Sequence, residues 1–82
     1  MTDLVNNHTM IFAETLKLKR KERGLLQKDI AQAIGVSVKT ISRFELGERE
    51  PSFEVLIKIA NFFETSTDYL VGKVDEFGNP KN

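Results

Sequence analysis

The stretch at residues 27–47 reads QKDIAQAIGVSVKTISRFELG, and its pattern decides the fold. Two short segments with apolar residues at helical spacing lie on either side of Gly35-Val36-Ser37, and Glu45-Leu46-Gly47 closes the second. The glycine permits a sharp turn, and Val36 and Ile41 anchor the second segment. The pattern predicts a helix-turn-helix whose second helix has outward residues free to enter a groove.

Capping residues and apolar periodicity predict three more helices around this unit. One is expected from Thr9, as its N-cap, to Arg23, and a short one is capped by Ser66 and ends at Gly72. Between them, a helix is expected after Pro51-Ser52. Its apolar stripe consists of Phe53, Leu56, Ile59, Ala60 and Phe63. No strand is predicted, so the expected class is all-α, a compact five-helix bundle.

Composition limits the chain to one domain and excludes several kinds of site. Its 82 residues are 40% hydrophobic, enough for a single core. No cysteine is present, so disulfides and thiolate metal sites are excluded, and His8 alone cannot form a zinc site. We expect no cofactor and no metal. The sequence shows no leader pattern and no apolar run long enough to span a membrane, so we expect a soluble, cytoplasmic protein.

The net charge of zero argues against a non-specific polyanion binder, but basic residues cluster between residues 17 and 43. This block holds eight basic side chains and two acidic ones. Most such clusters are solvated helix faces, and residues 17–23 alone favour that interpretation. Because the block overlaps the predicted helix-turn-helix, DNA becomes the favoured ligand.

Several motifs follow in order along LLQKDIAQAIGVSVKTISRFELGEREPSFEVLIKIA and the later STDYLVG. A glutamine opens the helix over 27–34, a GVS turn and TIS come next, and an E-x-G-x-R-x-P loop and DYLVG complete the order. Over roughly residues 10–72 the chain resembles the phage-repressor (lambda repressor-like, Xre-type) helix-turn-helix regulators. The resemblance implies a DNA-binding domain at 10–72, an N-terminal extension at 1–9 and a flexible or dimer-associated tail at 73–82. It implies no enzymatic activity.

The resemblance places outward residues of the helix over about 38–46 against base edges in the major groove. We expect Arg43 to be the strongest reader, because a guanidinium can donate to guanine O6 and N7 together, typically worth about 1–3 kcal/mol of discrimination. Lys39 is expected at a guanine or a phosphate, and Val38 against a thymine methyl. The residues expected to read bases are Ser37, Val38, Lys39, Thr40 and Arg43.

Phosphate contacts are expected at helix starts, where free N–H groups and the helix dipole favour an anion. The residues expected at phosphates, partly from the resemblance, are Gln27, Lys28, Ser42, Gly47 and Arg49. Leu26 stands where the family commonly has a threonine or serine, so this helix start lacks a side-chain cap worth about 1 kcal/mol.

Arg20 and Glu45 lie on helix faces that otherwise turn inward, Arg20 after Phe12 and Leu16, and Glu45 after Ile41. A buried charge needs a partner. The resemblance implies that the two side chains pair with each other and lock the first helix to the end of the reading helix. Arg20 is then a structural residue and no DNA contact.

The family binds operator DNA as dimers, so a homodimer is expected. The residues expected at its interface are Thr65, Val71, Val74 and Phe77. Phe77 is either an anchor for a partner or a disordered aromatic. The first nine residues contain no lysine or arginine, so an arm that grips the minor groove is not expected.

The sequence therefore predicts a sequence-specific DNA-binding regulator of transcription, most simply a dimeric repressor on a two-fold-symmetric operator in double-stranded DNA. Control would come from concentration, dimerisation or a regulatory protein partner, and no membrane is involved. The alternative is a protein-interaction module on the same fold, such as an antitoxin-like or adaptor protein. An enzyme is not expected, because no nucleophile-base pair, metal cluster or phosphate loop is visible.

Overall fold

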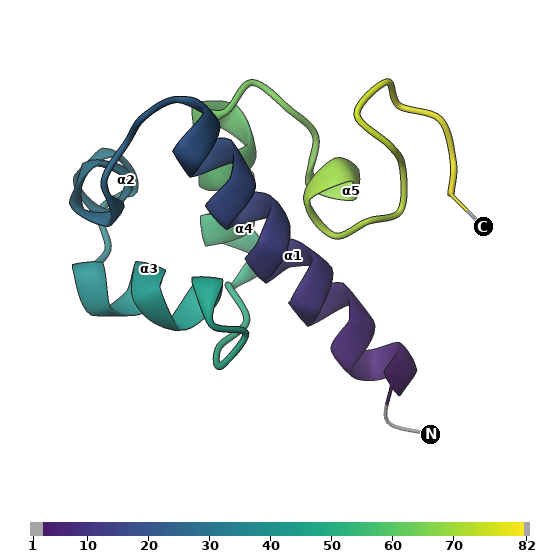
Figure 1. The fold of residues 1–82 in the computed structure, drawn as a ribbon, viewed down its shortest axis with the longest axis horizontal. Helices are drawn as coiled ribbons and strands as arrows, with labels where there is room; N and C mark the ends of the chain where they lie inside the picture. Colours follow the sequence, from purple (N-terminus) through teal and green to yellow (C-terminus); the bar gives the residue numbers. More distant parts are fainter. Residues whose placement is uncertain (1–2, 82) are drawn as a thin grey trace.

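Five helices follow one another along the chain and enclose one core (Figure 1). The structure is a computed structural model that describes the backbone of residues 3–81 and the side chains of residues 8–81. Within that part, the only pairing of the β type is an isolated bridge between Val74 and Pro80. The predicted all-α, five-helix class is confirmed. The helices are α1 (Asp3–Glu22), α2 (Gln27–Ile34), α3 (Val38–Glu45), α4 (Phe53–Phe62) and α5 (Thr67–Leu70).

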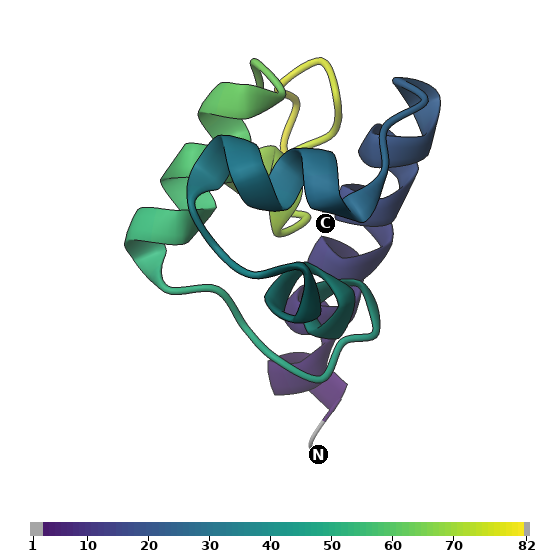
Figure 2. The same cartoon turned by 90° about the vertical axis from the view of Figure 1, so that its left-hand side faces the viewer.

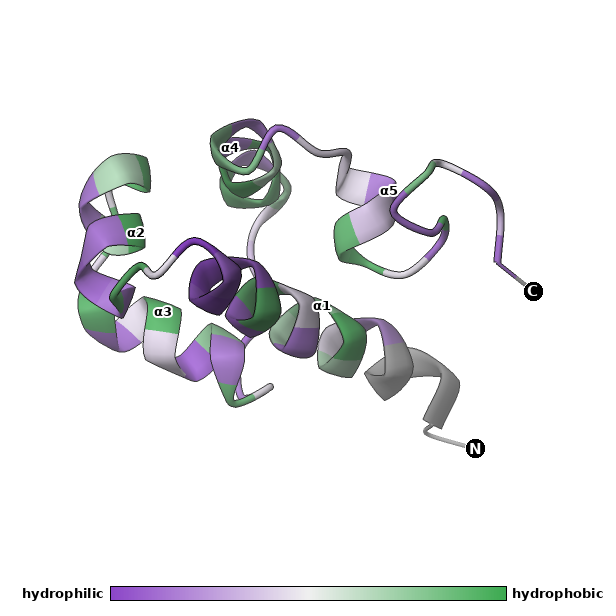
Figure 3. Ribbon diagram, turned by 45° about the horizontal axis from the view of Figure 1, so that its top comes forward, coloured by the Kyte–Doolittle hydropathy of each residue, from purple (hydrophilic) through white to green (hydrophobic). Residues whose placement is uncertain are grey.

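The core is made from one apolar face of each helix. α1 packs on α3 and α5, while α2 packs on α3 and α4. Phe12 of α1 and Phe44 of α3 meet edge to face, with ring centroids 5.7 Å apart. Figure 3 shows that α1 and α2 each carry hydrophobic residues interspersed with hydrophilic ones, as helices with one buried face do. The buried residues are Phe12, Ala13, Leu16, Ile30, Ala31, Ile34, Ile41, Phe44, Ile59, Ala60, Phe63 and Leu70.

Two expectations about the ends of helices are wrong. α1 begins at Asp3, so Thr9 lies inside the helix and does not cap it. The Thr9 hydroxyl instead donates to Oε2 of Glu50 at 2.6 Å and ties α1 to the loop before α4. Phe53 was expected in the apolar stripe of α4, but its side chain is 73% exposed. As the first residue of α4 it projects beyond the core, and the first fully buried residue of this helix is Ile59.

Serine side chains cap the starts of α3, α4 and α5. The hydroxyls of Ser37, Ser52 and Ser66 each accept the backbone N–H three residues on, at 3.0–3.2 Å. α2 has no such cap, because Leu26 carries no acceptor. Its start is stabilised from inside the helix, where the carboxylate of Asp29 accepts the N–H of Leu26 at 2.8 Å.

Arg23 joins α1 to the end of α4. Its guanidinium donates to the carbonyls of Phe62 at 3.3 Å and Phe63 at 3.1 Å, and it lies 5.2 Å from the centre of the Phe63 ring. These carbonyls are at the C-terminal end of α4, which has no basic residue in its own last turn. The cation therefore satisfies acceptors that this helix end leaves free.

Residues 73–81 fold back in a tight turn beyond α5. The carboxylate of Asp75 accepts the backbone N–H groups of Phe77 and Asn79, both at 2.9 Å. Hydrogen bonds from Asn79 and Phe77, together with the charge of Lys81, lower the pKa of Asp75, which burial alone would raise. The turn holds Phe77 at its tip, 79% exposed.

Candidate nucleic-acid interface

The turn between α2 and α3 sets the angle between the two helices. Gly35 has φ of 78°, a left-handed conformation that glycine adopts without steric cost. The N–H groups of Gly35 and Val36 both donate to the carbonyl of Ala31, at 2.9 and 3.0 Å. The chain then enters α3 through the Ser37 cap. Figure 2 shows α2 above α3, with the two helix axes crossing and α3 facing solvent.

α3 has a buried face and an exposed face. Ile41 and Phe44 are buried against α1 and α2, whereas Val38, Lys39 and Arg43 are exposed. Ser37 is also exposed and Thr40 is half-buried. The structure thus places all five candidate base readers on or beside the exposed face of one helix. Ser37 and Thr40 also bond to each other through their hydroxyls, at 2.9 Å, so these two hydroxyls are partly engaged.

Arg43 has an acidic neighbour that the sequence analysis did not single out. Its Nε lies 3.9 Å from Oε1 of Glu48, and both side chains are about half exposed. At this distance and exposure the pair contributes little to stability. Glu48 therefore acts on the electrostatics of the exposed face more than on the fold.

The candidate phosphate ligands fall into two groups. Lys28 and Arg49 are exposed, and neither enters an ion pair among the described residues. Ser42 is half-buried on α3. Gln27 is half-buried too, and its Nε2 donates to Oε1 of Glu45 at 3.0 Å. One of its two donors is therefore used inside the protein.

Arg20, Glu45 and Gln27 form a network that joins α1, α2 and α3. Nε of Arg20 donates to Oε2 of Glu45 at 2.7 Å, and Nη2 donates to Oε1 at 3.0 Å. The third nitrogen, Nη1, donates to the carbonyl of Leu25 at 2.9 Å. The Arg20 and Glu45 side chains are only 13% and 4% exposed. The hydrogen bond to Glu45 raises the pKa of Arg20, against the lowering effect of burial.

Gly47 completes the end of α3 in a backbone motif. Its N–H donates to the carbonyl of Phe44 at 3.1 Å, and the next N–H, of Glu48, donates to Arg43 at 3.0 Å. This is the Schellman arrangement, which needs a left-handed residue at this position, and Gly47 has φ of 74°. Because its only donor is already used, the geometry favours a structural role for Gly47 over the expected role at a phosphate.

Replacing Gly47 by alanine is expected to lower the free energy of unfolding by about 1–2 kcal/mol, because a Cβ is strained at this φ. The added Cβ would also lie 2.8 Å from Sδ of Met10, which would have to move. Urea unfolding measures the loss. Gly24→Ala isolates the effect of Met10, since Gly24 has φ of 66° and the same backbone strain, but nothing lies within 4 Å of the added Cβ. An unchanged midpoint for Gly47→Ala would contradict the assigned role.

The described part of the chain offers no metal site and no membrane-spanning helix. Residues 8–81 contain no group of three acidic or histidine side chains placed to hold a metal ion. None of the helices described is both long and apolar enough to cross a bilayer. The exposed face of α3 is therefore the best-supported candidate site in the described part of the chain.

Comparisons with known proteins also indicate a helix-turn-helix protein. A family model described as helix-turn-helix matches residues 16–70. The uncharacterized HTH-type transcriptional regulator YqaE of Bacillus subtilis is 39% identical over 61 residues, 74% of this chain and 53% of the relative. The cryptic phage CTXphi transcriptional repressor RstR of Vibrio cholerae is 38% identical over 64 residues, 78% of this chain and 57% of the relative. The chain spans about half the length of these curated relatives.

A solved structure supports the family at the level of fold. The crystal structure of a transcriptional regulator from Listeria innocua superposes with a TM-score of 0.73 and 42% sequence identity. The match covers 79% of this chain and 61% of that one. Together with the order of the helices and the capped turn, these matches identify the fold and its lineage. The chain belongs to the helix-turn-helix family of phage-repressor-like (lambda repressor-like, Xre-type) transcriptional regulators, a family that binds DNA and is not enzymatic.

Proposed function

We propose that this chain recognises a specific sequence in double-stranded DNA and regulates transcription there, most simply as a dimeric repressor. The observation that carries the proposal is the exposed face of α3, held rigidly from behind. Arg20, Glu45 and Gln27 fix the end of α3 to α1 and to the start of α2. A fixed reading helix places side chains against base edges without an added entropic cost on binding.

The exposed side chains divide by role. Arg43 is proposed to donate to a guanine, with Lys39 and Thr40 beside it on α3 and Val38 against a thymine methyl. Lys28 in α2 and Arg49 in the loop after α3 are proposed to bind phosphates of the DNA backbone. Ser42 is a weaker candidate. For Gln27 we propose a shared role, with one donor on Glu45 and the other on a phosphate. The Ser37 hydroxyl caps α3 and bonds to Thr40, so we propose that it contacts DNA only through its remaining hydrogen-bonding capacity.

A homodimer is proposed because one copy of α3 spans only half of a two-fold operator, whose half-sites lie about 34 Å apart. The interface candidates lie at and beyond α5. Thr65, Val71 and Val74 are half-buried, and Phe77 is exposed. Each copy would thus present one reading helix and one face from the α5 end of the molecule (Figure 1).

Selection from random-sequence DNA at physiological salt tests the proposal. The expected result is a two-fold-symmetric site whose affinity falls steeply as salt rises, because phosphate contacts release counterions. Selection of a single half-site would still support sequence-specific DNA binding, but it would contradict the proposed dimer. Weak, unselective binding would contradict sequence recognition and favour a protein-interaction module on the same fold.

Replacing Glu48 by glutamine is expected to raise the affinity for the selected DNA by about twofold to tenfold with no change in melting temperature. The carboxylate lies beside Arg43 on the proposed DNA face and repels approaching phosphates. The gain should shrink at high salt, since the effect is between exposed charges. Glu64→Gln, exposed in the turn after α4, is the control and should leave binding unchanged. Reduced affinity in Glu48→Gln would show that Glu48 positions Arg43.

A further inference from the structure

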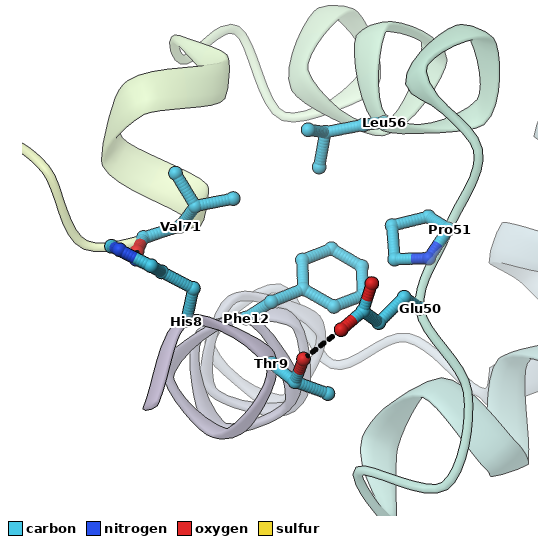
Figure 4. A pocket seen from close by; sticks show the side chains of 7 residues that line it. All are labelled: His8, Thr9, Phe12, Glu50, Pro51, Leu56 and Val71. Atoms are coloured by element: carbon cyan, nitrogen blue, oxygen red, sulfur yellow. Dashed lines mark hydrogen bonds between the residues drawn. The ribbon is translucent and has the colours of Figure 1, made fainter. Parts of the chain in front are cut away.

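A cavity of about 210 Å³ opens between the N-terminal half of α1, the start of α4 and the end of α5. Its lining is mainly apolar. Figure 4 shows the ring of Phe12 at the centre, with Pro51 and Leu56 on one side and Val71 on the other. A cavity of about 150 Å³ with apolar walls can hold a benzene molecule, so this one has room for a phenyl ring.

An exposed phenyl ring lies on the same end of the molecule. Phe77 is the most exposed large hydrophobic side chain of the described residues, at 79%. It stands at the tip of the turn that the Asp75 carboxylate and the Val74–Pro80 bridge hold together. The turn follows α5 directly, and α5 ends at the wall of the cavity, where Val71 lies. The ring is therefore displayed on an organised turn near the cavity.

One pair of opposite charges lies around the cavity and the ring. His8 and Glu50 flank the cavity on opposite sides of Phe12 (Figure 4). The turn carries Glu76 directly before Phe77 and Lys81 on its returning arm. The carboxylate of Asp75 accepts hydrogen bonds inside its own turn, and Nδ1 of His8 lies at hydrogen-bond distance, 2.7 Å, from the carbonyl of Val71. The ammonium of Lys81 can thus meet the carboxylate of Glu50 on the partner copy, at the edge of the cavity.

We propose that the cavity receives the Phe77 ring of a second copy of this chain, and that its own Phe77 enters the cavity of that copy. A two-fold axis requires each chain to carry both parts of the contact, which this chain does. The two buried rings would be the energetic centre of the interface, as aromatic anchors in pockets commonly are. This inference rests on the proposed dimer and names the contact that forms it.

Disulfide trapping tests the contact directly, because the chain has no cysteine of its own. The double variant Phe77→Cys with His8→Cys is expected to give a covalent dimer on mild oxidation, seen on a non-reducing gel. Phe77→Cys with Ala33→Cys is the control, since Ala33 is exposed on α2, away from the cavity. A dimer no more abundant than in this control or in Phe77→Cys alone would overturn the proposal. So would a disulfide closed within one chain.

Sedimentation of the unmodified chain separates this inference from the proposed function. Phe77→Ala, whose exposed side chain supports no packing, is expected to raise the dimer dissociation constant at least about 30-fold while the circular dichroism spectrum stays unchanged. Leu56→Phe, which narrows the cavity, should weaken the dimer in the same direction. If the wild type and Phe77→Ala dimerise equally, or if the wild type stays monomeric, the contact is wrong. DNA selection then still decides whether the chain recognises a sequence.

Discussion

Replacing Glu45 by alanine is expected to lower the free energy of unfolding by about 3–5 kcal/mol, the largest effect among the substitutions considered. Glu45 accepts two hydrogen bonds from Arg20 and one from Gln27, and its side chain is 4% exposed. Its loss strands the Arg20 guanidinium, of which only the bond to the Leu25 carbonyl remains. For a domain of this size the melting temperature should fall by about 12 °C or more.

Thermal unfolding followed by circular dichroism gives the result, and Lys39→Ala is the matched control. Lys39 lies on α3 as Glu45 does, but it is exposed, so its removal should leave the melting temperature nearly unchanged. The double variant Arg20→Met with Glu45→Leu should recover most of the lost stability, because it removes both buried charges together. Equal melting temperatures for Glu45→Ala and Lys39→Ala would refute the structural role of the network.

Replacing Arg43 by alanine is expected to remove discrimination at one base pair in each half-site. The wild type should prefer guanine there by about 1–3 kcal/mol per half-site, and Arg43→Ala should bind the selected site and its base-substituted form alike. Arg43 can make such a contact because it is exposed on α3 and only weakly held by Glu48. The measurement is the dissociation constant of the wild type and of Arg43→Ala for each of the two DNA sequences. These four values form a double-mutant cycle that isolates the contact between Arg43 and the base.

The matched control for this experiment is Lys28→Ala. Lys28 is an exposed phosphate candidate, so its loss should weaken both DNA sequences equally and make the dependence of affinity on salt shallower. Gln27→Ala is a poorer control, because it also removes a hydrogen bond to Glu45. If Arg43→Ala lowers the affinity for both sequences by the same factor, Arg43 is a phosphate ligand and not a reader.

The parts of the fold that the sequence predicted are those decided within a few residues. A serine cap, the left-handed glycine at position 35 and apolar spacing act locally, so the helices of the central unit follow from them. The start of α1 was missed because Asn6 and Asn7 have low helix propensity and Thr9 carries a typical cap side chain. The helix nevertheless continues through them, and the Thr9 hydroxyl finds Glu50 in the fold.

The residues that the sequence did not explain are those whose partners are distant in the chain. Arg23 read as part of a basic surface, yet it donates to carbonyls of Phe62 and Phe63. Gln27 read as a phosphate ligand, but its partnership with Glu45 depends on the angle between two helices. Phe53 has the right spacing for the core and only its place at the first turn of α4 exposes it. Apolar periodicity predicts which face of a helix is buried, but it does not predict at which residue along the helix the core ends.

The internal use of basic side chains has a consequence for the proposed recognition of one DNA sequence. Lys19 lies 5.3 Å from the Tyr69 ring and near Glu22, Arg20 is bonded to Glu45, and Arg23 caps α4. With these three cations in contacts inside the fold and a net charge of zero, we expect the chain to have a weak attraction for DNA of unrelated sequence. Fewer molecules would be held on decoy sequences, so a small number of copies per cell would suffice to keep a cognate site filled.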